Sequence, residues 1–308
     1  MINFRPIEIK DKQWIDPLLA SANMRGCQYN FTNLYGWGKV YHYCAAQILG
    51  HLVVKGELSN GRRYYFFPAG PGGETGTGGQ LQSVLEAMMQ DAADCKHEFI
   101  LYGLSPENTR AFESIFPGEF EFKLTRDGFD YVYLLDKLVT LSGSKLQAKR
   151  NHINHFKNNN IWSFEEISPD NIGECWEMDR EWCKLYGCKD DKRLTDEDCF
   201  VRQCFEHYTE LGLEGGLLRS GKRVIAFTMG DRLNSDTYDI HIEKAFRDIQ
   251  GAYQTINREF AALIQEKHPE MIYVNREEDL GMEGLRKAKM SYHPVRFEVK
   301  YAARYIGK

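Results

Sequence analysis

The sequence has 308 residues, of which 43% are hydrophobic and 27% charged, a composition typical of a folded globular protein. This length suits two domains of about 150 residues each. The formal net charge of −5 argues against a protein that coats nucleic acid through bulk positive charge. No apolar run approaches the roughly 20 residues of a membrane-spanning helix and no signal peptide is recognisable, so we expect a cytoplasmic protein without a transmembrane segment.

In the first half, the hydrophobic pattern predicts strands at 47–58 and 62–70, joined by a turn at Ser59-Asn60-Gly61. We interpret the glycine-rich stretch at 68–81 as a flexible surface loop, because the Gly-Lys-Ser/Thr ending of a phosphate-binding Walker loop is absent. A phosphate cradle is the alternative, since ligands often enter at such loops. The later elements are a helix with Leu81, Val84, Leu85 and Met88 on one face, a buried strand at 98–103, a helix at 105–116 and closing strands within 120–135.

The second half repeats this order. Residues 215–233 are predicted to form two strands joined near Ser220-Gly221, and 237–246 a third strand. After them come a helix with Tyr253, Ile256, Phe260, Leu263 and Ile264 on one face, a buried strand at 270–275, a short helix at 282–290 and a final strand at 294–303. Since both halves share one order of elements, we expect two copies of one α/β unit, at 1–140 and 141–308.

This order of strand, loop, helix, strand, short helix and strand is similar to that of the GNAT acyltransferase fold, so the chain resembles a tandem-GNAT protein. Two stretches, SGSKLQAKRNHINHFK at 142–157 and NREEDLGMEGLRKAKMSYHP at 275–294, carry a more specific resemblance. It is to the family of the C-terminal domain of phosphatidylglycerol lysyltransferases, in a stand-alone soluble form. The resemblance implies an α/β fold (α+β, with mixed sheets) built from two GNAT-like units.

The same resemblance implies transfer of an acyl or aminoacyl group from an acyl-CoA or an aminoacyl-tRNA, with no permanently bound cofactor. The implied partners are therefore a tRNA acceptor end or a CoA thioester. The implied acceptor is an amine or hydroxyl group on a small molecule, a peptide or a lipid headgroup. A non-catalytic binding or regulatory module that keeps the GNAT fold is the alternative.

The loop between the strand at 237–246 and the following helix lies where a GNAT unit binds the phosphates of its donor. The GNAT pattern [QR]-x-x-G-x-[GA] is matched at its ends by Arg247 and Ala252, but Gln250 stands in the place of the glycine and Gly251 comes one residue late. Backbone N–H groups at a helix start can bind phosphate oxygens. We therefore expect Arg247, Ile249, Gln250, Gly251 and Ala252 to bind the donor. Alternatively, Gly251 only eases entry into the helix.

Acyl transfer to an amine needs a base for the nucleophile and an acid for the leaving group. Because side chains alternate along a strand, Asp239, His241 and Glu243 share one face of the strand at 237–246, with Glu243 nearest the loop. We expect Glu243 and His241 to supply the base. Tyr292, just beyond the short helix, is the nearest tyrosine to the position at which the GNAT resemblance implies a general acid. A half-buried strand with one wet face is the alternative.

Polar residues follow the buried strand at 270–275, at an edge where α/β sheets bind ligands. Asn275, Glu277, Glu278 and Asp279 are expected to bind the aminoacyl group or the acceptor, since clustered carboxylates pair with an ammonium group. Acidic residues that complement the dipole of the following helix are the alternative.

Positive charge gathers at 145–157, where a helical pattern leaves Lys145, Lys149, His152 and Lys157 largely toward solvent. We expect Lys145, Lys149 and Arg150 to bind RNA or another phosphate-bearing partner, such as a tRNA acceptor end or the nucleotide of CoA. A solvated helix face that joins the two units is the alternative.

The eight cysteines form no CxxC pair. Cys183 and Cys188, like Cys199 and Cys204, are five residues apart, a spacing that does not place two side chains together on a helix. We therefore expect free, mostly buried thiols and no metal site.

Overall fold

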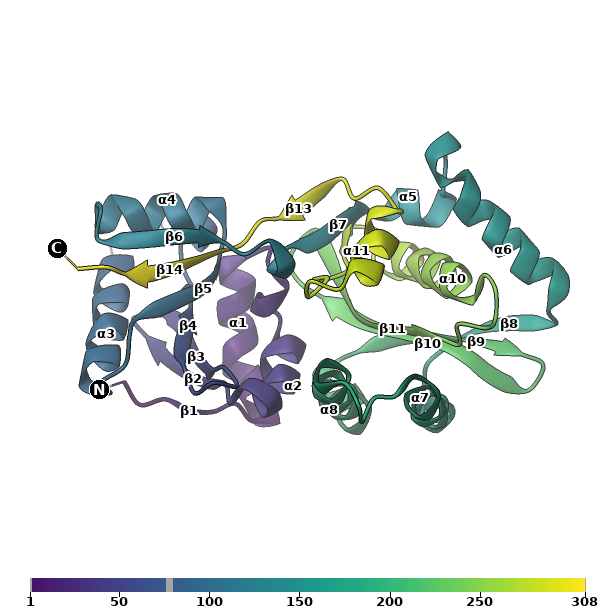
Figure 1. Cartoon of the computed structure of the whole chain (residues 1–308), viewed down its shortest axis with the longest axis horizontal. Helices are drawn as coiled ribbons and strands as arrows, with labels where there is room; N and C mark the ends of the chain where they lie inside the picture. Colours follow the sequence, from purple (N-terminus) through teal and green to yellow (C-terminus); the bar gives the residue numbers. More distant parts are fainter. Residues whose placement is uncertain (1, 76–79, 308) are drawn as a thin grey trace. The chain divides into compact units, whose positions relative to one another are not determined.

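The computed structural model describes residues 2–75 and 80–307, so residues 76–79 of the glycine-rich stretch lie outside the described part (Figure 1). The chain forms two compact units. Unit 1 comprises Met1–Asp130, Glu278–Glu283 and Phe297–Lys308, and unit 2 comprises Tyr131–Glu277 and Gly284–Arg296. The expected division after residue 140 differs from this one, because the C-terminal segment is part of unit 1 and residues 131–140 are part of unit 2.

The first sheet has seven strands in the order β1-β2-β3-β4-β5-β14-β6. Only β4 and β5 run parallel among the pairs with a described register. The elements of unit 1 are β1 (Arg5–Pro6), α1 (Lys12–Ala22), α2 (Phe31–Tyr41), β2 (Cys44–Ile48), β3 (His51–Glu57), β4 (Arg63–Phe66), α3 (Leu81–Asp94), β5 (Ile100–Leu104), α4 (Pro106–Ile115), β6 (Phe120–Leu124) and β14 (Tyr301–Tyr305).

The second sheet also has seven strands, in the order β13-β7-β12-β11-β10-β9-β8. Helix α10 covers one face of this sheet, and α7 and α8 cover the other (Figure 1). The elements are β7 (Asp130–Leu134), α5 (Leu135–Thr140), the 3₁₀ turn η5 (Ser144–Leu146), α6 (Gln147–Asn159), β8 (Trp162–Glu166), α7 (Ile172–Tyr186), α8 (Lys192–Glu206), α9 (Tyr208–Leu211), β9 (Glu214–Ser220), β10 (Arg223–Arg232), β11 (Thr237–Ala245), α10 (Ala252–Lys267), β12 (Tyr273–Asn275), α11 (Glu283–Met290) and β13 (Arg296–Glu298).

The predicted repeat is confirmed. The order β3-β4-α3-β5-α4 in unit 1 recurs as β10-β11-α10-β12-α11 in unit 2, and each sheet contains one parallel pair, β4/β5 or β11/β12. The amphipathic helices that follow β4 and β11 bury the predicted faces, as Val84, Leu85 and Met88 in α3 and Ile256 and Phe260 in α10 are completely buried. Burial of these side chains fixes each helix against its own sheet.

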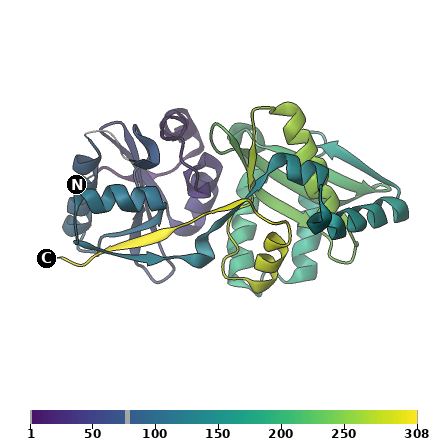
Figure 2. The same ribbon diagram turned by 90° about the horizontal axis from the view of Figure 1, so that it is seen from above.

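The closing strands are exchanged between the two halves of the sequence, which corrects the expectation that each half closes its own sheet. The C-terminal strand β14 lies between β5 and β6 in the first sheet, as both views show (Figure 2). In return β7 pairs with β12 in the second sheet, with Val274 opposite Tyr133. Both sheets need an antiparallel strand at this position, and a hydrophobic pattern does not specify which sheet a strand joins.

Two local expectations are also wrong. The single strand predicted at 47–58 is a hairpin of β2 and β3, whose turn at Leu49-Gly50 has φ of +46° and +76°. Two residues with positive φ form the tight turn that suits the twist of paired strands. The prediction that all cysteines are free is wrong for Cys183 and Cys188, which form a disulfide. Helix α7 ends before Gly187, whose φ of +73° turns the chain back so that Cys188 reaches Cys183.

None of the helices in the described part of the chain combines the length and the apolar character that spanning a lipid bilayer requires.

Candidate functional site

A polar centre lies in unit 2 where the parallel strands β11 and β12 part. Their described register ends at Asp239 opposite Asn275, whereas β11 continues to Ala245. The chain leaves β12 as Arg276-Glu277, so the side chains of these two residues meet those of the continuing β11. The carboxyl end of a parallel pair is where α/β proteins bind ligands, because loops diverge there and leave space between the strands.

Glu243 is the central residue of this site. Its Oε1 accepts a hydrogen bond from Arg276 Nη2 at 2.8 Å, and its Oε2 accepts one from Asn257 Nδ2 of α10, also at 2.8 Å. The side chains of Glu243 and Arg276 are only 12% and 11% exposed. A buried carboxylate is tolerated here because both oxygens have donors and one donor is a cation.

Arg276 has a hydrogen-bond donor that Glu243 does not use. Its guanidinium lies 4.9 Å from the ring centroid of Tyr292 and 5.6 Å from that of Tyr133. Burial lowers the pKa of Arg276, but Glu243, Tyr133 and Tyr292 together raise it by more, so this pKa lies above its ordinary value. Within residues 2–75 and 80–307, the buried Nη1 atom of Arg276 has no hydrogen-bond partner. Since an unsatisfied buried donor is costly, this atom marks a position suited to an acceptor oxygen of a ligand.

Two further predicted residues join this centre. Tyr292 is buried, and burial together with Glu243 raises the pKa of its hydroxyl, so it stays a neutral phenol at neutral pH. Lys149 of α6 lies 4.1 Å from the ring centroid of Tyr292 and donates to Ser291 Oγ at 2.6 Å. Burial, and next the charge of Arg276, lower the pKa of Lys149. The structure therefore brings together Glu243, Tyr292 and Lys149, which sequence reasoning had assigned to different roles.

His241 does not fit the expected role of a proton acceptor. Its Nδ1 lies 2.9 Å from Glu277 Oε1 and its Nε2 lies 3.1 Å from Asp231 Oδ1. Each ring nitrogen faces a carboxylate, so both nitrogens donate and the ring is an imidazolium. Burial lowers the pKa of His241, but Asp231, Asp239 and Glu277 together raise it by more. The pKa of His241 therefore lies well above its ordinary value. The face of β11 that carries His241 is also buried rather than wet.

The predicted donor loop uses several of its own amides. The N–H of Ile249 donates to the carbonyl of Phe246 and that of Ala252 to the carbonyl of Ile249, each at 3.2 Å. The N–H of Arg247 donates to the hydroxyl of Tyr186 at 2.8 Å. In this conformation these three amides are engaged within the protein and are not offered to a phosphate.

Gly251 has a packing role in this loop. Its φ is +87°, and a Cβ atom placed on it would lie 2.3 Å from the carbonyl oxygen of His152 in α6. The backbone of α6 therefore approaches the start of α10 as closely as only glycine allows. Gln250 and the side chain of Arg247 are exposed, the latter lying 4.3 Å from the ring centroid of Tyr186.

The acidic side chains that follow β12 do not form one binding site. Glu277 pairs with His241 in unit 2, whereas Glu278 pairs with Lys300 at 2.8 Å in unit 1. Asp279 lies 3.3 Å from Arg126, also in unit 1. The Oδ1 of Asn275 accepts the N–H of Glu277 at 2.7 Å and so shapes the turn out of β12. Each acid already has a basic partner, and the structure does not bring the three together.

The basic residues around α6 also do not form one cluster. Lys145 is exposed on η5, and Arg150 donates to the carbonyls of Leu141 and Gly143, which fixes the segment that precedes the helix. The expectation that Lys149 and Lys157 point largely to solvent is wrong. Lys149 turns to Tyr292, and Lys157 pairs with Glu259 of α10 at 2.8 Å.

Sequence reasoning missed Arg276 and Asn257 as site residues. Arg276 lies inside the stretch at 275–279 that was singled out for its acids, and Asn257 is a buried amide on the largely apolar inner side of α10. A buried asparagine next to a predicted site is a usable signal, because buried amides need partners.

The fold that these elements build is that of a tandem GNAT protein. A tandem GNAT protein from the clavulanic acid biosynthesis pathway superposes with a TM-score of 0.50 at 10% identity, over 99% of this chain and 98% of that one. The chain belongs to the family of the phosphatidylglycerol lysyltransferase C-terminal domain, whose model matches residues 19–304. The predicted resemblance is therefore confirmed.

The chain is also similar to three individual proteins. A conserved protein of unknown function from Bacteroides thetaiotaomicron has a TM-score of 0.92 and 38% identity, over 99% of this chain and all of that one. L-PGS from Bacillus licheniformis has a TM-score of 0.65 and 15% identity, over 97% of this chain and 93% of that one. An uncharacterised protein of Mycoplasmoides gallisepticum is 26% identical over 183 residues, and this match spans only 56% of that protein.

Proposed function

We propose that this chain is an aminoacyltransferase that moves an aminoacyl group from an aminoacyl-tRNA to an amine or hydroxyl acceptor at the Glu243–Arg276 centre. The observation that carries the proposal is the Nη1 atom of Arg276, which is buried and has no acceptor in the described part of the chain. A donor held in a buried position before the reaction begins is what stabilisation of a developing oxyanion requires.

Arg276 acts on the ester carbonyl. The carbonyl oxygen of the aminoacyl ester accepts a hydrogen bond from Nη1, while Nη2 stays bonded to Glu243. As the acceptor attacks, negative charge develops on that oxygen next to a buried cation, where electrostatic interactions are stronger than in water. Because Nη1 is already in place, little reorganisation accompanies the reaction.

Glu243 and Tyr292 move the protons. The Glu243 carboxylate takes the proton of the attacking amine or hydroxyl group as the new bond to the carbonyl carbon forms. The bond from that carbon to the ribose oxygen of the tRNA then breaks. Tyr292, a buried neutral phenol, supplies a proton to the leaving oxygen. After product release Glu243 gives its proton to solvent and Tyr292 takes one from solvent, which restores the site.

Two observations favour an aminoacyl-tRNA over an acyl-CoA donor. The family is described as phosphatidylglycerol lysyltransferase, C-terminal, which names an aminoacyl transfer. In addition, the loop that would hold the CoA phosphates uses the amides of Arg247, Ile249 and Ala252 internally, and α6 packs against Gly251. An aminoacyl-tRNA donor also places the proposed reaction in the cytoplasm.

The test is transfer by the full chain from tRNA charged with a radiolabelled mixture of amino acids. Acceptors are offered separately as phosphatidylglycerol vesicles, free amines and peptides, and the labelled product is separated by chromatography. We expect label to pass from tRNA to one acceptor class, with little transfer from acetyl-CoA in parallel reactions. Calorimetry with acetyl-CoA measures binding of the alternative donor.

The matched control is Glu259→Gln. Glu259 is a carboxylate on α10 that is 13% exposed and ion-paired with Lys157, so it resembles Glu243 in burial and charge but lies outside the centre. Glu243→Gln should slow transfer by about 10²–10⁴-fold, whereas Glu259→Gln should leave it intact. Transfer from acetyl-CoA alone would overturn the choice of donor, and equal activity of the two variants would overturn the site.

A further inference from the structure

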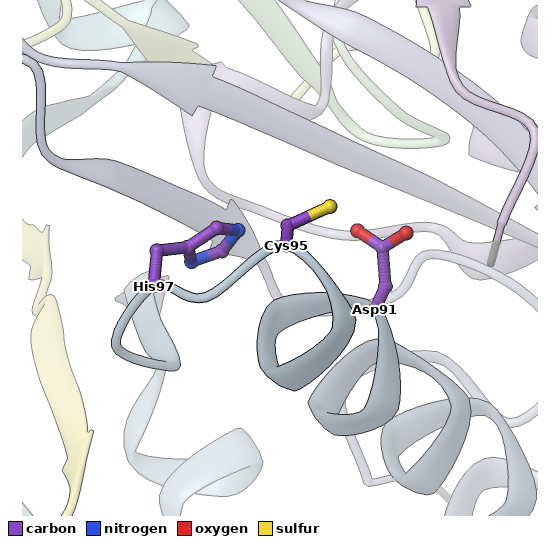
Figure 3. A group of neighbouring side chains, drawn as sticks. All are labelled: Asp91, Cys95 and His97. Carbon is purple, nitrogen blue, oxygen red and sulfur yellow. The ribbon is translucent and has the colours of Figure 1, made fainter.

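A cluster of three metal-ligating side chains lies at the end of α3 in unit 1, outside the site described above. Asp91 and Cys95 are four residues apart and so share one face of the helix end. Lys96 has a φ of +55°, and the N–H of His97 donates back to the carbonyl of Ala92 at 3.0 Å. This reversal returns His97 to the same side as the other two, as Figure 3 shows.

The spacing and the chemistry of this cluster suit zinc. One ligand atom each from Asp91, Cys95 and His97 lies within 4.8 Å of the others. Bonds of about 2.0–2.3 Å in a tetrahedral zinc site place ligand atoms about 3.3–3.8 Å apart, so side-chain shifts of about 1 Å close the site. Oxygen, thiolate sulfur and imidazole nitrogen are the three ligand types that zinc takes in proteins.

The histidine is already oriented as a ligand. His97 Nδ1 lies 3.0 Å from the carbonyl oxygen of Glu98. A carbonyl only accepts, so Nδ1 carries the hydrogen and, in the neutral ring, Nε2 carries the lone pair. A backbone carbonyl that holds the second nitrogen of a histidine is the usual outer partner of a metal-bound imidazole. Nε2 lies 3.4 Å from the hydroxyl of Tyr65, on the side of the cluster.

The other two ligands are available. The thiol of Cys95 is half-buried and forms no disulfide among residues 2–75 and 80–307. Asp91 Oδ1 accepts one bond, from the N–H of Ile2, which leaves it a lone pair. Asp91 Oδ2 accepts from Tyr65 at 2.8 Å and from Lys55 at 3.1 Å. The hydroxyl proton of Tyr65 is thus directed to Asp91 and not to the lone pair of His97.

We propose that Asp91, Cys95 and His97 bind Zn²⁺ in unit 1, with the fourth position taken by water or the hydroxyl of Tyr65. The metal ties the helix end to β4 through Tyr65 and to the N-terminal segment through the Ile2–Asp91 bond. Lys55 opposes the metal, because its ammonium group repels a dication near the shared carboxylate. Removing this repulsion should tighten metal binding, whereas losing the contact of Lys55 with the ring of Phe4 gives no reason for tighter binding. A Lys55 variant therefore distinguishes a metal site from a packing role.

The test is zinc binding by the full chain after removal of metal with a chelator. Competition with a chromogenic chelator should show about one Zn²⁺ bound per chain, and Co²⁺ should give a thiolate-to-metal charge-transfer band in the near ultraviolet. Cys95→Ser and His97→Ala should each weaken zinc binding by about tenfold or more, and Cys95→Ser should remove the band. Lys55→Gln should bind more tightly than the wild type.

The control for a nonspecific thiol is Cys44→Ser, since Cys44 is another half-buried free cysteine of unit 1. It should leave affinity and spectrum unchanged. Circular dichroism of the metal-free variants shows whether each folds. Wild-type zinc affinity in folded Cys95→Ser and His97→Ala, a cobalt spectrum without a thiolate band, or weaker binding by Lys55→Gln would overturn the proposal.

Discussion

Arg276 Nη2 donates a hydrogen bond to Glu243 Oε1 at 2.8 Å. Glu243 lies on β11 and Arg276 directly follows β12, just beyond the point where the pairing of these two parallel strands ends. The pair therefore spans a gap that backbone hydrogen bonds no longer close. Asn257 holds the second carboxylate oxygen from α10, so three separate elements position one charged group. A site built in this way has its charges in place before a substrate arrives.

The first prediction concerns catalysis at this pair. Arg276→Met removes the spare donor and should lower kcat by about 10²–10³-fold with a much smaller change in KM, because Nη1 acts chiefly on the transition state. Glu243→Gln should lower kcat by about 10²–10⁴-fold. The glutamine offers an oxygen to Arg276 and an N–H to the buried amide oxygen of Asn257, which has no partner in the described part of the chain, so the variant should fold.

Steady-state kinetics of the two single variants and the double variant check this prediction. Losses in the double variant should be smaller than the product of the single losses, because the two residues act as a unit. Arg276→Met with wild-type kcat, or a change confined to KM, would contradict a role in the transition state.

The second prediction concerns the pH dependence of stability at His241. Its folded pKa lies well above the ordinary value of 6.5. A raised pKa means that the charged ring stabilises the fold fully below about pH 6.5 and that this contribution is lost as pH rises through the folded pKa. The difference in unfolding free energy between the wild type and His241→Gln should therefore shrink as pH rises from about 6 to about 9.

Urea denaturation at several pH values measures this difference. His155→Gln, on the exposed face of α6, is the control and should give no trend. A difference that stays flat or grows with pH would show that His241 is neutral in the folded protein.

Local periodicity predicted much of the fold. The apolar faces of α3 and α10 and the order of elements in each half follow from side-chain spacing along one segment. The exchange of β7 and β14 could not be predicted in this way. Local pattern predicts a strand in both regions, but the choice of sheet depends on pairing across more than a hundred residues.

The candidate site shows the same limit. Alternation along β11 placed His241 and Glu243 on one face, but the charge of His241 depends on Asp231 in the neighbouring strand β10. Similarly, the residues of the donor loop gave no sign that α6 packs against Gly251. The charge or packing of a residue that depends on a second helix or strand can be read from the structure but not from the pattern of its own segment.

The third prediction concerns the buried ion pair of unit 1. Lys300 Nζ lies 2.6 Å from Asp130 Oδ1 and 2.8 Å from Glu278 Oε1, and its side chain is 5% exposed. Burial lowers the pKa of Lys300, but Asp130, Cys27 and Glu278 together raise it by more, so the lysine stays charged. Asp130→Asn leaves this charge without its nearest partner and should lower the free energy of unfolding by about 3–5 kcal/mol.

Urea denaturation at neutral pH measures the loss. The control is Glu121→Gln, which removes a partner of Arg304 on the surface, where the two side chains are 60% and 53% exposed. That change should cost less than about 1 kcal/mol, because solvent screens an exposed pair. Similar losses of unfolding free energy in the two variants would mean that Asp130 stabilises the fold no more than an exposed surface charge does.

The last prediction separates packing from ligand binding at Gly251. Gly251→Ala places a methyl group 2.3 Å from the carbonyl oxygen of His152 on a backbone with φ of +87°. Left-handed backbone alone costs an alanine about 1–2 kcal/mol, and the clash with α6 should add about 1–3 kcal/mol. Gly221→Ala is the control, since Gly221 has a φ of +60° with nothing within 4 Å of the added methyl group. If urea denaturation gives equal, small losses for both variants, α6 does not press on Gly251 in solution.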